Sequence, residues 1–533
     1  MRRFHSYGPV DSDEHFCVPR RELVEHCTQQ LIGNPEKGGH YFTIWAPRQT
    51  GKTWLMRQVL QEIPRRYKEQ FTVFHFSLGT LRNMTFMPSE ADQGMALPVR
   101  FGRLLERVLP DNPAVRDWED FCDLFSKDRG LWGRPLILLI DEFDTIPSAL
   151  IALVVAQFRE LNLNRETNWL HGLALIGVRA VLGVDSHSGS PFNIQKSLHV
   201  PNLTDAEVID LYQQYQRESG QPIESDVVEE VIRVTNGQPG LVSWFGELLT
   251  DQYNPGGKQS IGPEIWETVW LKARFKEPNN TVMNLISKAR EPEYRPFLVE
   301  LFTHSDIPFI FHDPIQNYLY LNGILSSRTE TTAKGTEEIC RFTSPFVQEC
   351  LYDALSRELL ADRVPELPLE PLDDLADVFE KNTLDLPALL MRYTAYLARL
   401  KAKGINPWKD QPRRKTDFHL TEAVGHFHLY AWLKDAVRDE CVVSPEFPTG
   451  NGKVDLHVRC RQQRGIIEVK SFTSASRLKK EQRDAAEYAK GLGLDAVTMA
   501  VFIPVEDETV LEKLSGEVMI EGVRVTVVAI GWV

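Results

Sequence analysis

The chain has 533 residues and a net charge of -14, and it is 42% hydrophobic and 25% charged. At roughly 150 residues per domain, this length predicts about three or four folded domains, and the acidic balance excludes a chain coated with nucleic-acid-binding surface. No apolar run reaches the ~18 residues of a membrane-spanning helix, and the N-terminus has no apolar stretch behind its charges, so we expect a cytoplasmic protein that does not engage membranes.

The first 200 residues predict a parallel α/β sheet. Apolar, strand-like runs at Tyr41–Ala46, Phe71–Leu78, Leu136–Ile140 and Leu173–Val178 are separated by amphipathic stretches of helical length. Strands that alternate with helices favour a parallel sheet with helices on both faces.

A phosphate-binding loop follows the first of these strands. The segment matches the pattern G-x-x-x-x-G-K-[ST] except that alanine replaces the first glycine, and it lies between a strand and a helix. Backbone N–H groups of such a loop hold phosphates, the lysine reaches the terminal phosphates, and the Ser/Thr hydroxyl binds Mg²⁺. We therefore expect ATP to contact Ala46, Pro47, Arg48, Gln49, Thr50, Gly51, Lys52, Thr53 and Trp54.

A second motif, about ninety residues later, completes the predicted ATP site. Leu136–Asp144 reads LILLIDEFD, an apolar strand that delivers carboxylates at its C-terminal end. Asp141 is expected to hold Mg²⁺, and Glu142 is expected to polarise the attacking water. Asp144 is expected to cap the next helix.

The pattern changes to helices after Pro201. Between residues 260 and 360 further helices, including Asn317–Ile324, precede a polar turn at Ser326–Gly335 and a helix at Arg341–Leu355, which together suggest a winged-helix unit. The preceding helical segments are Asp205–Ser219, Ser225–Val234 and Gln238–Leu249.

Over about residues 10–360 the sequence resembles the STAND branch of the AAA+ ATPases. Beyond the two motifs, the resemblance includes Gly177-Val178-Arg179 after the fourth strand, Ser190-Pro191-Phe192-Asn193, and Gly237-Gln238-Pro239 at the start of a helix. The resemblance implies that Arg179 and Pro239 sense the nucleotide. It also implies Mg²⁺-ATP as cofactor and a homo-oligomer formed through the ATPase domain.

A proline-rich acidic stretch, Arg363–Asp374, predicts an interdomain linker. Beyond it a second α/β pattern begins. Its expected elements are a helix at Leu386–Leu400, a helix at Thr421–Asp439, strands near Val454–Arg459 and Gly465–Lys470, a helix at Lys479–Leu492 and a strand at Ala496–Ile503.

This second pattern carries a carboxylate and lysine constellation. A glycine turn leads to Asp455, and thirteen residues later a strand carries Glu468-Val469-Lys470, whose alternation puts Glu468 and Lys470 on one face. The grouping suits phosphodiester hydrolysis, because two carboxylates can share divalent ions while the lysine steadies negative charge. Glu-x-Lys alone is a weak motif, and a salt-bridged pair on an exposed strand is the alternative.

Residues 385–533 resemble the PD-(D/E)XK nuclease superfamily, with Val-Asp in place of Pro-Asp. The resemblance implies an additional acidic ligand, Glu422, on the preceding helix. Gln482 with Tyr488 matches a Q-x-x-x-x-x-Y arrangement that resembles resolvase-like members, and this implies a catalytic role for Gln482. The nearby pair His426 and His428 does not share a helix face, so a zinc site is not expected.

The charge distribution and the cysteine spacing support two further expectations. Between Arg399 and Lys490 there are 19 Lys/Arg and 12 Asp/Glu residues, a local excess of seven positive charges, so a nucleic-acid partner is expected to meet this segment first. The seven cysteines are scattered without a Cys-x-x-Cys pair, so we expect reduced, mostly buried thiols and no disulfide.

The sequence thus predicts an α/β multidomain protein in which ATP controls a Mg²⁺-dependent nuclease acting on DNA or RNA, with a protein or nucleic-acid trigger and a role in defence against foreign nucleic acid. The alternative is a signalling or scaffolding ATPase whose nuclease-like domain only binds nucleic acid. The expected domains are an ATPase core (1–200), a helical lid (201–258), a winged-helix-like domain (259–361), a linker (362–384) and a restriction-endonuclease-like domain (385–533).

Overall fold

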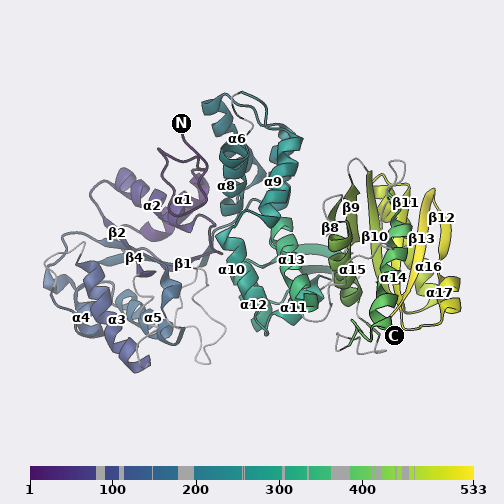
Figure 1. Ribbon diagram of the computed structural model, residues 1–533. Coiled ribbons are helices and arrows are strands. Elements are labelled where there is room, and N and C mark those ends of the chain that lie inside the picture. The colour runs from purple at the N-terminus through teal and green to yellow at the C-terminus, as the bar shows by residue number, and fades with distance from the viewer. Residues whose placement is uncertain are drawn as a thin grey trace. The chain divides into compact units, whose positions relative to one another are not determined.

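The computed structural model forms two compact units, residues 1–283 with 310–326 and residues 284–309 with 327–533 (Figure 1). None of the helices in the described part of the chain is long and apolar enough to cross a membrane. The structure describes residues 1–79, 90–106, 113–146, 148–177, 197–254, 256, 258–302, 307–332, 335–361, 378, 384–409, 413, 419–420, 422–437, 441–446, 455–460 and 463–532.

A five-stranded parallel sheet lies at the centre of the first unit. The strands follow the order β2-β3-β4-β1-β5, so the strand that enters the phosphate loop and the strand that ends in Asp141 flank β4. This confirms the predicted parallel α/β sheet. The strands are β1 (Tyr41–Trp45), β2 (Thr72–Ser77), β3 (Leu136–Asp141), β4 (Leu170–Gly177) and β5 (Ser197–His199).

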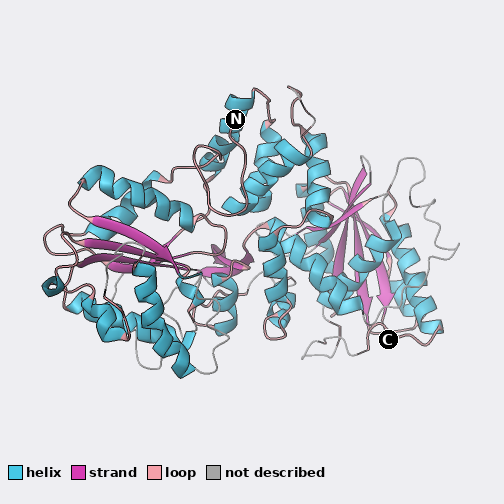
Figure 2. Cartoon of the chain, turned by 60° about the vertical axis from the view of Figure 1, so that its left-hand side comes forward, coloured by secondary structure: helices cyan, strands magenta, loops and turns pink. Residues whose placement is uncertain are grey.

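Helices cover both faces of this sheet, as the magenta strands between cyan helices show in Figure 2. Side chains alternate along β3: Leu136, Leu138 and Ile140 pack in one apolar core, whereas Ile137 and Leu139 pack in the other. The face with Ile137 and Leu139 is covered by α1 (Arg21–Ile32) and α2 (Lys52–Tyr67). The face with Leu136, Leu138 and Ile140 is covered by α3 (Glu90–Leu105), α4 (Trp118–Asp123) and α5 (Ser148–Leu163).

A helical part completes the first unit. Thr204 and Glu207 form a reciprocal capping box at the start of α6, and Gln238 with Pro239 starts α8. Its helices are α6 (Asp205–Ser219), α7 (Ser225–Thr235), α8 (Pro239–Glu247) with a π-helical turn (Leu248–Gln252), α9 (Pro263–Phe275) and α12 (Pro314–Leu321), while α10 (Asn280–Ala289) runs on into the second unit and α11 (Arg295–Leu301) belongs to it.

The 326–342 segment differs from its predicted structure. The expected polar turn at Ser326–Gly335 is wrong, because most of it belongs to strand β6 (Leu325–Thr332), which pairs with β7 (Gly335–Phe342). Backbone pairing and threonine's β-propensity outweigh the polarity of this stretch. The helix expected from Arg341 begins only at Pro345, as α13 (Pro345–Ala361). The winged-helix interpretation stays a prediction.

A six-stranded mixed sheet forms the C-terminal part of the second unit, in the order β12-β13-β11-β10-β9-β8. Only β10–β11 and β11–β13 pair in parallel. The elements are α14 (Leu386–Ala402), α15 (Glu422–Val437), β8 (Val442–Glu446), β9 (Asp455–Cys460), β10 (Gln463–Ser471), α16 (Ala475–Gly491), β11 (Ala496–Ile503), α17 (Glu508–Leu514), β12 (Gly516–Ile520) and β13 (Val523–Gly531). Strands β8, β12 and β13 are not among the predicted ones.

Helices pack on both faces of this sheet. Leu478 and Ala485 of α16 share an apolar core with Ile466 and Val501. The opposite face receives aromatic side chains, with the Tyr393 and Phe502 ring centroids 6.4 Å apart. Glu468 and Lys470 alternate in register with Ile466, so all three lie on the α16 face.

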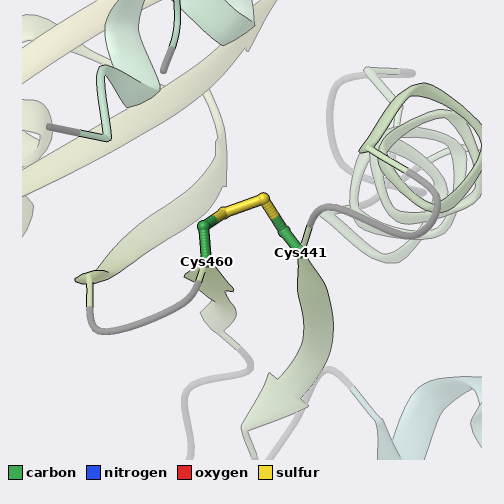
Figure 3. Close-up of a disulfide and its surroundings, with 2 residues drawn as sticks. All are labelled: Cys441 and Cys460. Atoms are coloured by element: carbon green, nitrogen blue, oxygen red, sulfur yellow. A yellow bond between two sulfur atoms is a disulfide. The ribbon is translucent and has the colours of Figure 1, made fainter. Parts of the chain in front are cut away.

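A disulfide joins Cys441, just before β8, to Cys460 at the end of β9 (Figure 3). The expectation that all cysteines are reduced thiols is therefore wrong. The antiparallel register pairs Val442 with Arg459. The adjoining residues, Cys441 and Cys460, therefore lie opposite one another, with Cα atoms 4.2 Å apart. Spacing along the sequence could not reveal this pairing, because strand β8 was not predicted.

Candidate functional site

The predicted phosphate loop lies between β1 and α2, as expected. Its turn requires two left-handed residues, Gln49 (φ 57°) and Gly51 (φ 88°), and Gly51 adopts this conformation at no steric cost. Thr50 donates its hydroxyl to the Pro47 carbonyl at 2.8 Å. Lys52 Nζ donates to the carbonyls of Ala46 and Pro47, at 2.8 and 2.6 Å, so the loop closes on its own lysine.

Burial lowers the pKa of Lys52 to about 8. The negative charges of Asp144 and Asp141 oppose this shift, and the effect of Asp144 on the pKa of Lys52 is the larger. Asp144 therefore lies electrostatically close to the lysine, in a 3-10 turn (Phe143–Thr145), where a Cβ on Gly177 would come within 2.9 Å of its Oδ1. The expected capping role is wrong, because the next helix begins only at Ser148.

Asp141 and Thr53, the two predicted Mg²⁺ ligands of the ATP site, contact each other. Thr53 Oγ1 donates to Asp141 Oδ2 at 3.1 Å, and the Glu142 backbone N–H donates to Asp141 Oδ1 at 2.8 Å. Burial raises the pKa of Asp141, and these hydrogen bonds work against the rise. A hydroxyl and a carboxylate at this separation suit a small divalent cation with oxygen ligands.

Glu142 has an unusual backbone and a partner that the sequence did not reveal. Its φ is 54°, a left-handed conformation that is rare for a non-glycine residue. Ser77, at the end of β2, donates its hydroxyl to Glu142 Oε2. A Cβ on Gly79 would lie 2.1 Å from the same oxygen, so Gly79 makes room for the carboxylate. Ser77 has no motif in the sequence, and only the pairing of β2 with β3 places it here.

The helix entry that contains Pro239 lies against the phosphate loop. The N–H of Gly240 donates to the Gln49 carbonyl at 3.0 Å, and the Gln238 side-chain amide donates to the Arg48 carbonyl at 3.3 Å. The structure thus brings the predicted sensor turn to the predicted loop. Arg179, the other predicted sensor, lies outside the described residues.

The N-terminal segment reaches the same region. The Trp54 indole N–H donates to the Val18 carbonyl at 2.8 Å, and Gln214 of α6 donates to the Cys17 carbonyl at 3.0 Å. Residues before α1 therefore connect α2, at the phosphate loop, with the helical part of the unit.

The second predicted constellation forms around a buried lysine. Lys470 Nζ lies 2.9 Å from Glu422 Oε1 and 3.2 Å from Glu468 Oε1. The side chain of Lys470 is 5% exposed and that of Glu468 is 1% exposed. The pair is therefore buried, whereas the alternative interpretation expected a salt-bridged pair on an exposed strand. Burial of two such charges requires close pairing. Glu422 approaches from the first turn of α15.

The register of the sheet brings Asp455 to this place. In the antiparallel pairing of β9 with β10, Asp455 is directly opposite Glu468, and β8 places Glu446 opposite Asp455. Opposite positions in an antiparallel pair share a face. Three acidic positions thus form one row across three strands, and Glu446 was not singled out from the sequence because β8 was not predicted.

Helix α16 supplies Gln482 and its neighbour Glu481. Both are half-buried. Burial raises the pKa of Glu481, and the opposing influences include its hydrogen bond from Arg477 and the charge of Lys470. Glu481 is thus electrostatically coupled to Lys470, a relation that the sequence does not indicate, because only the neighbouring Gln482 belongs to a recognisable motif.

The two histidines of α15 point to different helices. His428 Nδ1 shares a 2.6 Å hydrogen bond with the Tyr393 hydroxyl of α14, and burial lowers the pKa of His428 to about 3. His426 Nδ1 is hydrogen-bonded to the Tyr352 hydroxyl of α13. Among the described side chains, no three His, Cys, Asp or Glu residues form a group that could hold a metal, and the Asp455 side chain is not among them.

No family model matches the sequence, and no curated protein matches it. Solved structures similar to the chain include the Walker-type ATPase PABY2304 of Pyrococcus abyssi, with 14% identity and a TM-score of 0.40 over 65% of this chain and 99% of that one. The Aeropyrum pernix ORC1 protein, solved in complex with DNA, shares 14% identity at a TM-score of 0.32 over 65% and 94%. Cdc6p from Pyrobaculum aerophilum shares 15% identity at a TM-score of 0.36 over 66% and 97%.

Proposed function

We propose that this chain couples an ATP-binding switch to a metal-dependent nuclease. The observation that carries the proposal is the buried Lys470 amine, which lies between the carboxylates of Glu468 and Glu422 on a strand paired with Asp455. The substrate class is nucleic acid, whose phosphates are attracted to the basic excess between Arg399 and Lys490. We propose defence against foreign nucleic acid as the role, and a homo-oligomer formed through residues 1–200 as the assembly.

At the ATP site, each side chain has a separate task. Lys52 leaves the Ala46 and Pro47 carbonyls to bind the terminal phosphates, which are stronger acceptors because they are charged. Thr53 and Asp141 are the residues that would hold Mg²⁺, which neutralises charge on the phosphates when it is bound. Glu142 accepts a hydrogen bond from the attacking water once it separates from Ser77.

At the nuclease site, Glu468, Asp455 and Glu422 would hold a divalent cation, because they offer the oxygen ligands that Mg²⁺ prefers. Such a cation would polarise the phosphate and activate water. Lys470, once it is released from Glu422, can stabilise the negative charge that develops on the phosphate. Gln482, on the adjacent helix, is proposed to orient the water.

Nucleotide binding and phosphate release test the first half of the proposal. Lys52→Ala and Asp141→Ala should weaken ATP binding or hydrolysis, whereas Glu142→Gln should retain binding and slow turnover by about 10²- to 10⁴-fold. Lys37→Ala, at an exposed turn residue, is the control. Unchanged hydrolysis by Lys52→Ala would show that the loop does not bind ATP.

Cleavage of labelled plasmid, single-stranded DNA and RNA tests the second half, with and without ATP and Mg²⁺. Asp455→Ala, Glu468→Ala and Lys470→Ala should lose cleavage alike, because the members of one catalytic unit are not additive. ATP hydrolysis should survive in all three. Cleavage that persisted in EDTA, or in the Asp455→Ala protein, would eliminate the metal-dependent mechanism and favour a scaffold that only binds nucleic acid.

A further inference from the structure

The N-terminal segment Arg2–Arg20, here called the strap, packs against α6 and α8 of the same unit. It is the purple trace that precedes α1 in Figure 1. Phe4 is 1% exposed, and its ring centroid lies 4.9 Å from that of Tyr212 in α6. A Cβ on Gly246, near the end of α8, would lie 2.3 Å from Phe4 Cδ1. The ring of Phe4 therefore occupies space that only a glycine at this position of α8 leaves open.

Hydrogen bonds hold the strap on both sides of Phe4. Ser6 donates its backbone N–H and its hydroxyl to the two carboxylate oxygens of Glu247, at 2.9 and 2.6 Å. Arg2 Nε donates to Glu218 Oε1, near the end of α6, at 2.8 Å. Hydrogen bonds to an ionised acceptor are stronger than those between neutral groups. The strap is thus bound to both helices by polar as well as aromatic contacts.

Further along, the strap holds the helix that begins in the phosphate loop. The Trp54 indole N–H donates to the Val18 carbonyl at 2.8 Å, and Arg57 Nη1 donates to the Val10 carbonyl at 2.7 Å. Trp54 follows directly after Thr53, which is one of the two proposed Mg²⁺ ligands of the ATP site. The strap therefore contacts the first two turns of α2.

Helix α8 itself connects the strap with the phosphate loop. At its start the Gly240 N–H donates to the Gln49 carbonyl at 3.0 Å, and near its end Gly246 receives Phe4. At 1.5 Å per residue these two positions of the helix are about 9 Å apart. The contacts form a closed series from the loop to α8, to the strap, to α2 and back to the loop, and all of them lie within the first unit.

We propose that the strap is a latch that keeps α8 on the phosphate loop and thereby limits how fast nucleotide leaves the ATP site. The inference rests on the proposed function and names the regulation of its ATP site. When Phe4 and Ser6 are released, the strap no longer ties α8 to α2, so α8 separates from the loop more often. Local openings of this kind become more frequent as buried apolar contacts and hydrogen bonds are lost. A nucleotide held in the loop then leaves faster.

Three substitutions in the full chain open the latch in different ways. Phe4→Ala removes the ring and Ser6→Ala removes the hydroxyl. Gly246→Ala places a methyl group against the ring, although alanine is favoured over glycine within a helix, so it displaces Phe4 without weakening α8 itself. Tyr7→Ala, at a residue of the strap that is 43% exposed, is the matched control for the ring, and Ser12→Ala, also exposed, is the control for the hydroxyl. Melting curves verify folding.

Hydrogen exchange without nucleotide tests whether the strap holds the two helices. Exchange in 205–219 and 239–247 should increase at least about tenfold in Phe4→Ala and Gly246→Ala, and about two- to tenfold in Ser6→Ala. Both controls should behave like wild type. In the Phe4→Ala protein, Gly246→Ala should add nothing, because the ring that it displaces is already absent. Exchange that stays at the wild-type level in Phe4→Ala and Gly246→Ala would overturn the inference.

The release of a fluorescent ATP analogue tests the consequence for the ATP site. With Mg²⁺ and an excess of unlabelled ATP, its dissociation should become at least about fivefold faster in Phe4→Ala and Gly246→Ala. Faster exchange with an unchanged dissociation rate would overturn the proposed limit on nucleotide release. A wild type that does not bind the analogue would overturn the ATP site together with that limit, whereas the exchange data decide independently whether the strap holds α6 and α8.

Discussion

Thr53 and Asp141, separated by 88 residues in the sequence, meet in a 3.1 Å hydrogen bond at the carboxyl edge of the parallel sheet. One side chain comes from the first turn of α2 and the other from the last residue of β3. Because both side chains offer oxygen atoms and one is charged, they would hold a divalent cation in place of this hydrogen bond.

Thr53→Val should therefore reduce Mg²⁺-dependent ATP hydrolysis. The substitution keeps the shape of the side chain and removes the hydroxyl, while Thr53→Ser keeps the hydroxyl. Loss of a residue that only supports a metal ligand costs about 10- to 100-fold, and loss of a direct ligand should cost at least as much. Phosphate release measured across a Mg²⁺ titration checks this, and a Thr53→Val protein with the wild-type Mg²⁺ requirement would contradict it.

Nucleotide binding should be accompanied by proton uptake near pH 8.5. The pKa of Lys52 is lowered to about 8, so much of the amine is neutral there, and a bound phosphate raises its pKa. Titration calorimetry in buffers of different ionisation enthalpy measures the uptake. An observed enthalpy that does not depend on the buffer would refute the shift, and Lys52→Met should show no uptake from this group.

The same shift has a consequence for stability. Between pH 8 and the ordinary lysine value of 10.5, the unfolded chain binds more protons at this residue than the folded chain does. The contribution of Lys52 to the free energy of unfolding therefore rises with pH across this window.

Ser77→Ala should increase ATP turnover. The serine hydroxyl holds the Glu142 carboxylate, and its loss frees the carboxylate to orient water. A net hydrogen-bond free energy of about 0.5–1.5 kcal/mol corresponds to about a two- to tenfold change in rate. Steady-state kinetics should show the increase in kcat with little change in KM, and Ser77→Thr should behave like wild type. A decrease as large as that of Glu142→Gln would mean instead that Ser77 supports the reaction.

Nucleic-acid binding by the full chain should weaken as salt increases, because each neutralised phosphate releases counterions. Lys479 and Lys480 are exposed on the first turns of α16, next to the strand that carries Lys470. Lys479→Ala combined with Lys480→Ala should reduce the logarithmic salt slope by about 0.7–0.9 per lost contact. Fluorescence anisotropy between 50 and 200 mM salt measures this slope, with Lys37→Ala as control.

Reduction of the Cys441–Cys460 disulfide should destabilise the second unit. The bond closes a loop of 19 residues, for which chain entropy gives about 3 kcal/mol of stabilisation. Peptide mapping without reductant should recover the two cysteines in one linked fragment. Cys441→Ser should lower the melting temperature, and a reductant should then have no further effect. If reductant does not alter the wild-type melt, the bond is absent or carries no stability.

Local patterns were sufficient for several elements and for the position of the predicted phosphate loop. The bounds expected from the sequence are correct for α6 (Asp205–Ser219) and β11 (Ala496–Ile503). A capped amphipathic helix and an apolar strand can each be recognised from the spacing of their own apolar residues. The predicted loop lies between β1 and α2 as expected, because the apolar strand before it and the helix after it each show their own pattern in the sequence. Glu468 and Lys470 were paired correctly on one face since strand alternation relates residues two apart.

Relations between distant segments were decided only by the tertiary structure. Ser77 reaches Glu142 through the register of β2 with β3, and Cys441 reaches Cys460 through the register of β8 with β9. The spacing of apolar residues along a single strand does not determine either register, because strand pairing depends on which faces the whole sheet buries. The contact of Tyr352 with α15 is of the same kind. An apolar helix face in the sequence predicts that this face is buried, but only tertiary packing decides which element covers it.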